Sequence, residues 1–208
     1  MSRLLLAIDT TSESGSLALF LTGAEDGHVL EEVALDSPDG FAHVMFPEIE
    51  RLLARHHLKI TDVEGFAAAA GPGSFTGVRV GLTAAKGLAE ATGRQVAAIS
   101  NLQALASFGT RALRAPVIDA RRGDIFGAVY DADLQLVLPE VVMTLEEFMQ
   151  TLPAGDVEVI NHPPKHLAGA IARIAAARFQ AGLAQDPAAI DANYVRRSDA
   201  ELMWRDKV

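Results

Sequence analysis

The segment from Glu64 to Thr92 reads EGFAAAAGPGSFTGVRVGLTAAKGLAEAT, in which a glycine-rich loop joins a short apolar run to a longer one. The run Glu64 to Ala70 has the length of a buried strand, and Val78 to Thr92 has the length and composition of a helix. Gly93 suits the left-handed position just past a helix C-terminus. The segment therefore predicts a strand, a loop at Gly71–Gly77 and a helix.

The loop Gly71–Gly77 stands where backbone N–H groups can approach an anion at the positive end of a helix dipole. It is not a dinucleotide fingerprint, because its third glycine comes one residue late, and Val78 and Arg79 replace the Lys and Ser/Thr of a P-loop. It is not a nucleophile elbow either, because Pro72 stands where the G-x-S-x-G motif has its first glycine. A tight turn that uses glycine for positive φ and close packing is the alternative, and the chemistry of the loop alone favours it.

Three apolar runs precede this segment, and short Gly, Ser and Asp turns between them predict an antiparallel meander over Arg3–Asp9, Ser16–Leu21 and His28–Leu35. Apolar residues at helical spacing then predict a helix through Phe46, Ile49, Leu52 and Leu53, with Pro47 in its first turn or kinking it. With a strand at Val96–Ile99 and a helix at Leu102–Phe108, the order is that of ribonuclease H-like and actin-like ATPase lobes. Such a lobe has a mixed sheet with helices on both faces.

The second half repeats this pattern loosely. Strands are predicted at Ala115–Asp119, Ile125–Asp131, Leu134–Val142 and Val157–Ile160, and helices after the Thr144–Glu147 capping box and over Leu167–Gln180. We see no low-complexity linker. We therefore expect two directly packed lobes, an N-terminal one over residues 1–108 and a smaller C-terminal one over residues 109–208.

Composition excludes several classes of function. The 208 residues carry 18 Lys and Arg against 27 Asp and Glu, a net charge of −9, which argues against a dominant sequence-independent grip on nucleic acid. Cysteine is absent, so disulfide scaffolds, thiol nucleophiles and cysteine zinc sites are excluded. No apolar run reaches the about 18–20 residues of a membrane span. The N-terminal run ends in Asp9 rather than a small-residue cleavage site, so we expect the cytoplasm.

Few residues are candidates for a catalytic or ligand-binding role. Asp9-Thr10-Thr11 stands at the end of the first strand. In actin-like ATPases an acidic residue and hydroxyls at this place face metal-bound phosphates. The alternative is an Asx turn, in which these side chains bond to the nearby backbone. His162 and His166 are four residues apart, but the prolines between them oppose the helical turn a metal pair needs. Nothing in the spacing supports a triad of His43, Ser74 and Asp9 or Asp119. The clusters Arg121-Arg122 and Arg196-Arg197 need no explanation beyond surface charge, and in a composite RNA site they would contact only phosphates.

The helix predicted at Val78–Thr92 is apolar around most of its circumference, and Gly81 and Gly87 keep it slim. Such a helix must be covered on more than one side, by the core or by a second protein. The same choice applies to the preceding helix that contains Phe46.

Together these stretches strongly resemble the bacterial TsaB (YeaZ-like) proteins. The resemblance covers nearly the whole chain in order, more loosely from Tyr130 to Ile190. Its glycine-rich block is highly specific. The matching stretches are Leu5–Thr11, Gly71–Gly81, Ala85–Ala89, Ile118–Asp124 and Tyr194–Arg196.

The resemblance implies an α/β protein of the actin-like ATPase (ribonuclease H-like) fold, with two lobes of mixed sheets flanked by helices and the second lobe reduced. It also implies a role in making threonylcarbamoyladenosine in tRNA. TsaB-like proteins form a heterodimer with their catalytic relative TsaD and help to assemble a complex with the ATPase TsaE. That complex modifies the adenosine beside the anticodon of ANN-decoding tRNAs, so tRNA is reached only through the complex.

One comparison with the catalytic relatives decides the expected role. Their metal ligands form a His-x-x-x-His pair, and Asn101 and Leu105 stand at those positions here. Leucine cannot bind a metal, so we expect an accessory subunit with no catalytic residue and no metal. The stretch Ile160–Pro164 also lacks the glycine-rich turn that cradles adenosine in related lobes. No independent cofactor is therefore expected, although a weak ATP or ADP site where subunits meet stays open.

This hypothesis assigns residues to two sets. The expected interface with TsaD, which would support a homodimer in its absence, consists of His43, Phe46, Pro47, Ile49, Leu53, Val78, Leu82, Ala85 and Lys86. An inherited phosphate site, or a nucleotide contact at a subunit boundary, would use Asp9, Thr10, Thr11, Gly71, Gly73, Ser74, Thr76 and Gly77. The alternative from another class is a metal-independent hydrolase or peptidase acting through Ser74. For a small-molecule kinase the chain is too short.

Overall fold

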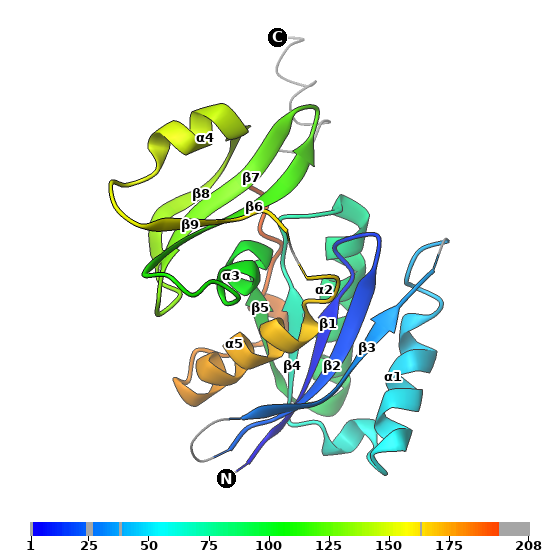
Figure 1. Cartoon of the computed structure of the whole chain (residues 1–208). Helices are drawn as coiled ribbons and strands as arrows, with labels where there is room; N and C mark the ends of the chain where they lie inside the picture. The colour runs from blue at the N-terminus through cyan, green and yellow to red at the C-terminus, as the bar shows by residue number, and fades with distance from the viewer. Residues whose placement is uncertain (1, 24–26, 38, 163, 196–208) are drawn as a thin grey trace.

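A computed structural model describes residues 2–23, 27–37, 39–162 and 164–195, arranged around two β-sheets (Figure 1). The predicted basic tail, with Arg196 and Arg197, lies outside the described residues, as does Pro163 between the two histidines. None of the helices in the described part of the chain combines the length and apolar character needed to cross a bilayer.

The larger sheet has the strand order β3-β2-β1-β4-β5. The first three strands form the predicted antiparallel meander, and β4 and β5 extend it in parallel with β1. This is the actin-like arrangement that the resemblance implies, and the fold prediction is confirmed. The bounds are β1 (Leu4–Asp9), β2 (Gly15–Leu21), β3 (His28–Leu35), β4 (Gly65–Ala69) and β5 (Gln95–Ile99).

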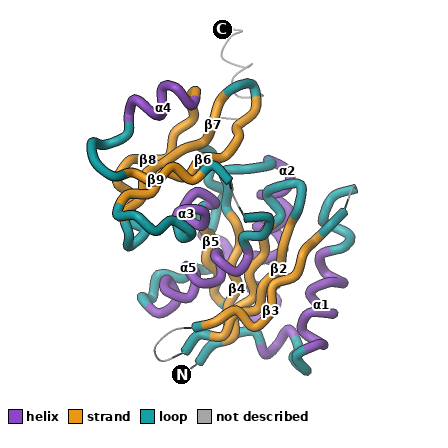
Figure 2. The backbone as a smooth tube through the Cα atoms, in the orientation of Figure 1, coloured by secondary structure: helices purple, strands orange, loops and turns teal. Residues whose placement is uncertain are grey.

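Helices cover both faces of this sheet (Figure 2) because the central strands are apolar on both sides. Leu6 and Ile8 of β1 face α1 and α2, whereas Leu5 and Ala7 face α5. The helices are α1 (Met45–Arg55), α2 (Phe75–Thr92), α3 (Asn101–Ala106) and α5 (Ala168–Gln180), with single 3₁₀ turns at Ile60–Asp62 and Pro187–Ala189.

Helix α2 begins three residues before the predicted Val78. Ser74 caps it by accepting a hydrogen bond from the Gly77 N–H at 3.3 Å, which supplies a partner for one donor of the first turn. At the other end Gly93 adopts φ 64° and ψ 37°, which confirms the predicted left-handed C-terminal position.

The smaller sheet has the order β8-β7-β6-β9. Its first hairpin turns at Arg121-Arg122-Gly123, where all three residues have positive φ. Thr144 and Glu147 form the predicted capping box at the start of α4. The bounds are β6 (Leu113–Arg121), β7 (Asp124–Asp131), β8 (Leu136–Thr144), α4 (Leu145–Thr151) and β9 (Val157–Ile160).

The chain returns to the larger sheet after β9. Ile171, Ala175 and Phe179 of α5 pack against the face that carries Leu5 and Ala7. Gln185 then forms an antiparallel bridge with Val96 of β5. Residues of the second half therefore complete the core of the first sheet, and a domain division at residue 108 stays a prediction.

The N-terminal half of α2 lies directly against the loop after β1. A Cβ atom at Gly77 would overlap the carbonyl oxygen of Thr10, and one at Gly81 would lie 2.6 Å from Thr10 Oγ1. A Cβ at Gly73 would lie 2.7 Å from the carbonyl oxygen of Thr11. Close packing, the alternative explanation of the glycine-rich loop, is therefore what these glycines provide.

We predict opposite effects for one substitution at two glycines of α2. Gly77→Ala should lower the free energy of unfolding by about 2 kcal/mol or more, because the loop after β1 would have to move. Gly87→Ala should raise it by about 0.5–1 kcal/mol, because Gly87 has open space around it and alanine favours the helix. Urea unfolding of both variants measures the difference. Equal stability of the two would contradict the close-packing assignment.

Candidate functional site

Three loops meet at the carboxyl ends of β1, β4 and β5. Because these strands run parallel, the segments that follow them emerge at one edge of the sheet. They are Thr10-Thr11, the glycine-rich loop from Gly71 and Ser100-Asn101. The structure thus brings together the residues of the predicted phosphate site.

Asp9 is buried, with 2% of its surface exposed. Its Oδ1 accepts hydrogen bonds from the backbone N–H of Thr11 at 2.9 Å and from the Thr11 hydroxyl at 2.6 Å. This is the Asx turn considered as the alternative for this segment. Burial raises the pKa of Asp9, and the hydrogen bonds from Thr11 oppose that rise.

The neighbouring threonine and serine also bond within the chain. The Thr10 hydroxyl donates to the carbonyl oxygen of Gly77 at 2.7 Å, and the Ser74 N–H donates to the carbonyl oxygen of Thr11 at 2.7 Å. These bonds fix the start of α2 on the loop after β1. Thr76, the remaining predicted polar residue of the glycine-rich loop, is exposed in the first turn of the helix.

Asn101 holds the three loops together. Its side-chain N–H donates to Thr11 Oγ1 at 2.5 Å, and its Oδ1 accepts from the backbone N–H of Gly71 at 3.0 Å. Its own backbone N–H donates to the Gly71 carbonyl at 2.8 Å. The sequence marks this position only by comparison with the catalytic relatives, because nothing in its spacing predicts contacts with residues 30 and 90 positions away.

Glu140 of β8 ties the smaller sheet to this region. It accepts hydrogen bonds from the hydroxyls of Ser100 and Tyr130 and, at 2.5 Å, from the amide of Asn193. Burial and the nearby Glu140 charge raise the pKa of Tyr130, which therefore remains a neutral donor. A lone glutamate in an edge strand gives no sequence signal for this role, so the sequence alone does not predict it.

The residues of the alternative hydrolase are engaged elsewhere. Ser74 acts as the helix cap described above, whereas His43 lies 3.4 Å from the hydroxyl of Ser37 and Asp9 accepts from Thr11. None of the hydrogen bonds between described residues links Ser74 to a histidine. In the same described ranges no three His, Asp or Glu side chains lie close enough together to hold a metal ion.

The predicted interface needs a correction. The side chains of Ile49, Leu53, Val78, Leu82 and Ala85 lie in the core between α1, α2 and the larger sheet, so they cannot form an exposed docking face. The buried stripe of α1 passes through Met45 rather than Phe46. Of the nine residues, His43, Phe46 and Pro47 are exposed and Lys86 is half-buried. Whether these four contact a partner stays a prediction.

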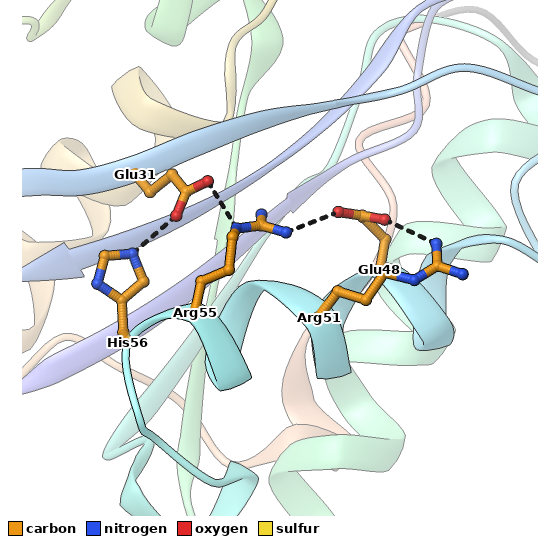
Figure 3. A network of polar contacts seen from close by, with 5 residues as sticks. All are labelled: Glu31, Glu48, Arg51, Arg55 and His56. Atoms are coloured by element: carbon orange, nitrogen blue, oxygen red, sulfur yellow. Dashed lines mark hydrogen bonds and ion pairs between the residues drawn. The ribbon is translucent and has the colours of Figure 1, made fainter.

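A polar network secures α1 against the edge strand β3 (Figure 3). Arg55 donates to Glu31 at 2.9 Å, and His56, the capping residue that follows the helix, lies 2.8 Å from the same carboxylate. Glu48 accepts from Arg51 and Arg55. The Arg55 guanidinium holds the pKa of Glu31 below its usual value. The network positions α1 and lies outside the three-loop region.

Comparison with known proteins agrees with the resemblance. Residues 38–196 match the family described as TsaD, tRNA N6-adenosine threonylcarbamoyltransferase. The chain is 32% identical to the tRNA threonylcarbamoyladenosine biosynthesis protein TsaB of Bacillus subtilis, over 75% of this chain and 69% of that protein. It is 35% identical to the protein of the same name from Escherichia coli, over 62% of this chain and 55% of that protein.

The match thus spans little more than half of the Escherichia coli relative. Among solved structures, YeaZ from Pseudomonas aeruginosa superimposes with a TM-score of 0.75 and 24% identity, over 92% of this chain and 99% of that one. At this identity the likeness concerns the fold.

We predict that Asp9→Asn stabilises the fold at neutral pH by a few degrees in Tm. Asparagine keeps an oxygen that can accept from Thr11 and removes a buried charge. The pKa of Asp9 is raised in the folded protein. Its ionisation therefore costs no stability below the unfolded pKa near 3.8, and the cost is complete once the pH has risen through the folded pKa. The gain in Tm of Asp9→Asn over the wild type should therefore shrink toward acid pH. Thermal unfolding across pH measures it, and a lower Tm at neutral pH would show that the carboxylate stabilises the fold.

Proposed function

Because this chain belongs to the TsaB (YeaZ-like) family, we propose that it is a non-catalytic subunit of the complex that makes N6-threonylcarbamoyladenosine in tRNA. In this proposal the chain binds TsaD and enables the recruitment of the ATPase TsaE. TsaD then transfers the threonylcarbamoyl group to the adenosine beside the anticodon of ANN-decoding tRNAs. The names of the relatives support the pathway, and the three-loop region supports the absence of catalysis.

The observation that carries the proposal is the environment of Leu105. This residue stands at the second histidine position of the catalytic relatives, and it is fully buried in the core beneath α5. Metals are bound by oxygen, nitrogen and sulfur donors, none of which leucine offers. At the first position both ends of the Asn101 amide are used by Thr11 and Gly71. The residues present therefore do not fit the metal of the catalytic relatives.

The phosphate-site residues support the same conclusion. A phosphate cradle needs backbone and side-chain donors that point outward at an anion. Here the hydroxyls of Thr10 and Thr11 donate to Gly77 and Asp9. The space over Gly73 and Gly77 is filled by the backbone of Thr10 and Thr11. The loops thus serve packing within this chain, and a weak nucleotide site remains a proposal only for a boundary between subunits.

The docking surface is proposed around the exposed end of α1. Phe46 is 47% exposed there, next to Pro47 and close in sequence to His43. An exposed aromatic ring near the centre of an interface is typical of residues that contribute much of the binding free energy. A specific complex would bury on the order of 1,600 Å² in total. Without TsaD, the same surface would favour a symmetric homodimer.

We predict that Phe46→Glu abolishes co-purification of this chain with TsaD and leaves its Tm within a few degrees of the wild type. The reason is that the ring is exposed and a charge there would be desolvated in the complex. Leu183→Glu, the same kind of change at an exposed leucine elsewhere, should retain TsaD. Ile49→Glu should instead lose the fold, because Ile49 is in the core. Normal TsaD binding by Phe46→Glu would contradict this docking surface.

A further inference from the structure

An aromatic and cationic cluster lies on the surface where α2 begins. The guanidinium carbon of Arg79 lies 3.7 Å from the centroid of the Phe75 ring and 6.0 Å from that of Tyr194. The two rings are 5.6 Å apart at 36°. Arg79 Nε donates to the Tyr194 hydroxyl at 3.0 Å. Residues 115 positions apart thus form one preorganised surface.

The cluster leaves its binding capacity largely unused. Phe75 and Tyr194 are 44% and 47% exposed, so their rings contribute little to the core. The hydrogen bond to Tyr194 uses only the Nε of Arg79. Among the ion pairs between described residues, none includes Arg79. Its two Nη groups therefore offer N–H donors to an external anion.

The position of Tyr194 is fixed by the backbone before it. The N–H of Asn193 donates to the Ala70 carbonyl at 2.8 Å, and the Asn193 side chain bonds to Glu140. Phe75 and Arg79 belong to a helix whose start is held on Thr11 by the Ser74 N–H. Hydrogen bonds thus hold the backbone on both sides of the cluster, which limits the order that has to be gained on binding.

We propose that Phe75, Arg79 and Tyr194 bind one unpaired nucleotide of an RNA. The rings and the guanidinium plane would stack with the base, and the Nη groups of Arg79 would bind a phosphate. Aromatic rings beside arginine are how proteins hold bases that are splayed out of a helix. A carboxylate alone would use only the guanidinium, whereas a nucleotide uses the rings through its base and the guanidinium through its phosphate, so we assign the cluster to a nucleotide and make a protein contact an outcome of the test.

This inference rests on the proposed function only in naming RNA as the nucleic acid. The protein has a net charge of −9, so a diffuse electrostatic grip is weak and a local contact has to supply the binding. We therefore expect a weak, salt-dependent interaction that prefers single strands. Base stacking inside a duplex would deny the rings access to a base.

The test is fluorescence anisotropy of a labelled oligouridine titrated with the full chain at low salt. Phe75→Ala should weaken binding about tenfold, as loss of one stacked base does. Arg79→Ala should weaken it at least as much and reduce the salt slope by about 1. Arg94→Ala removes a comparable exposed charge just past the other end of α2, so it should stay within about twofold of the wild type. Unchanged Tm values confirm that the variants fold.

Three results would overturn the inference. One is the absence of wild-type binding up to about 0.1 mM protein, the weak limit of non-specific binding. Another is equal weakening by Phe75→Ala and Arg94→Ala, which would indicate diffuse charge. The third is loss of TsaD co-purification in Arg79→Ala with RNA binding intact, which would indicate a protein contact. The proposed function is judged by TsaD binding in the Phe46 variant and not by oligouridine, so the two can fail separately.

Discussion

The contact between the glycine face of α2 and the backbone of Thr10 and Thr11 is the constraint on which the rest of the structure depends. Because Gly73, Gly77 and Gly81 carry no Cβ, the helix start can lie directly on the loop after β1. That approach covers Asp9 and lets Asn101 reach Thr11 and Gly71. The region where parallel strands end, normally an open ligand crevice, is thereby filled with the protein's own polar groups.

This filling gives a physical reason for the proposed absence of catalysis. A buried carboxylate whose pKa is raised by burial destabilises the fold at neutral pH, yet Asp9 is retained with its oxygen bonded to Thr11. Leu105, which the resemblance places at a metal-ligand position of the catalytic relatives, is part of the apolar core. In the proposed role, the actin-like ATPase fold serves as a packed body whose outer surfaces are available for partners. In the proposed complex, the net charge of −9 leaves most of the contact with tRNA to the other subunits.

Local sequence patterns predict most of the fold, because strand length, helical periodicity and caps are local properties. The meander, the helix ending at Gly93 and the Thr144 capping box are confirmed in this way. The prediction that Ile49 and Leu82 form an interface was wrong, because both cover the chain's own sheet. The sequence pattern of an apolar helix face is the same whether that face packs on the core or on a partner. The contacts of Asn101, Glu140 and Tyr194 join distant segments, and no spacing rule encodes them. The start of α2 was predicted three residues too late, at Val78, because the role of Ser74 as the helix cap was not recognised in the sequence.

The most direct measurement is formation of threonylcarbamoyladenosine in vitro from TsaD, TsaE and an ANN-decoding tRNA, with and without this chain. The proposal of a non-catalytic subunit predicts that modification requires the chain and is fully restored by its Ser74→Ala variant, because Ser74 caps α2 and is assigned no catalytic role. Modification at the same rate without the chain would contradict the proposed role. So would a Ser74→Ala variant that assembles with TsaD and still fails to support modification.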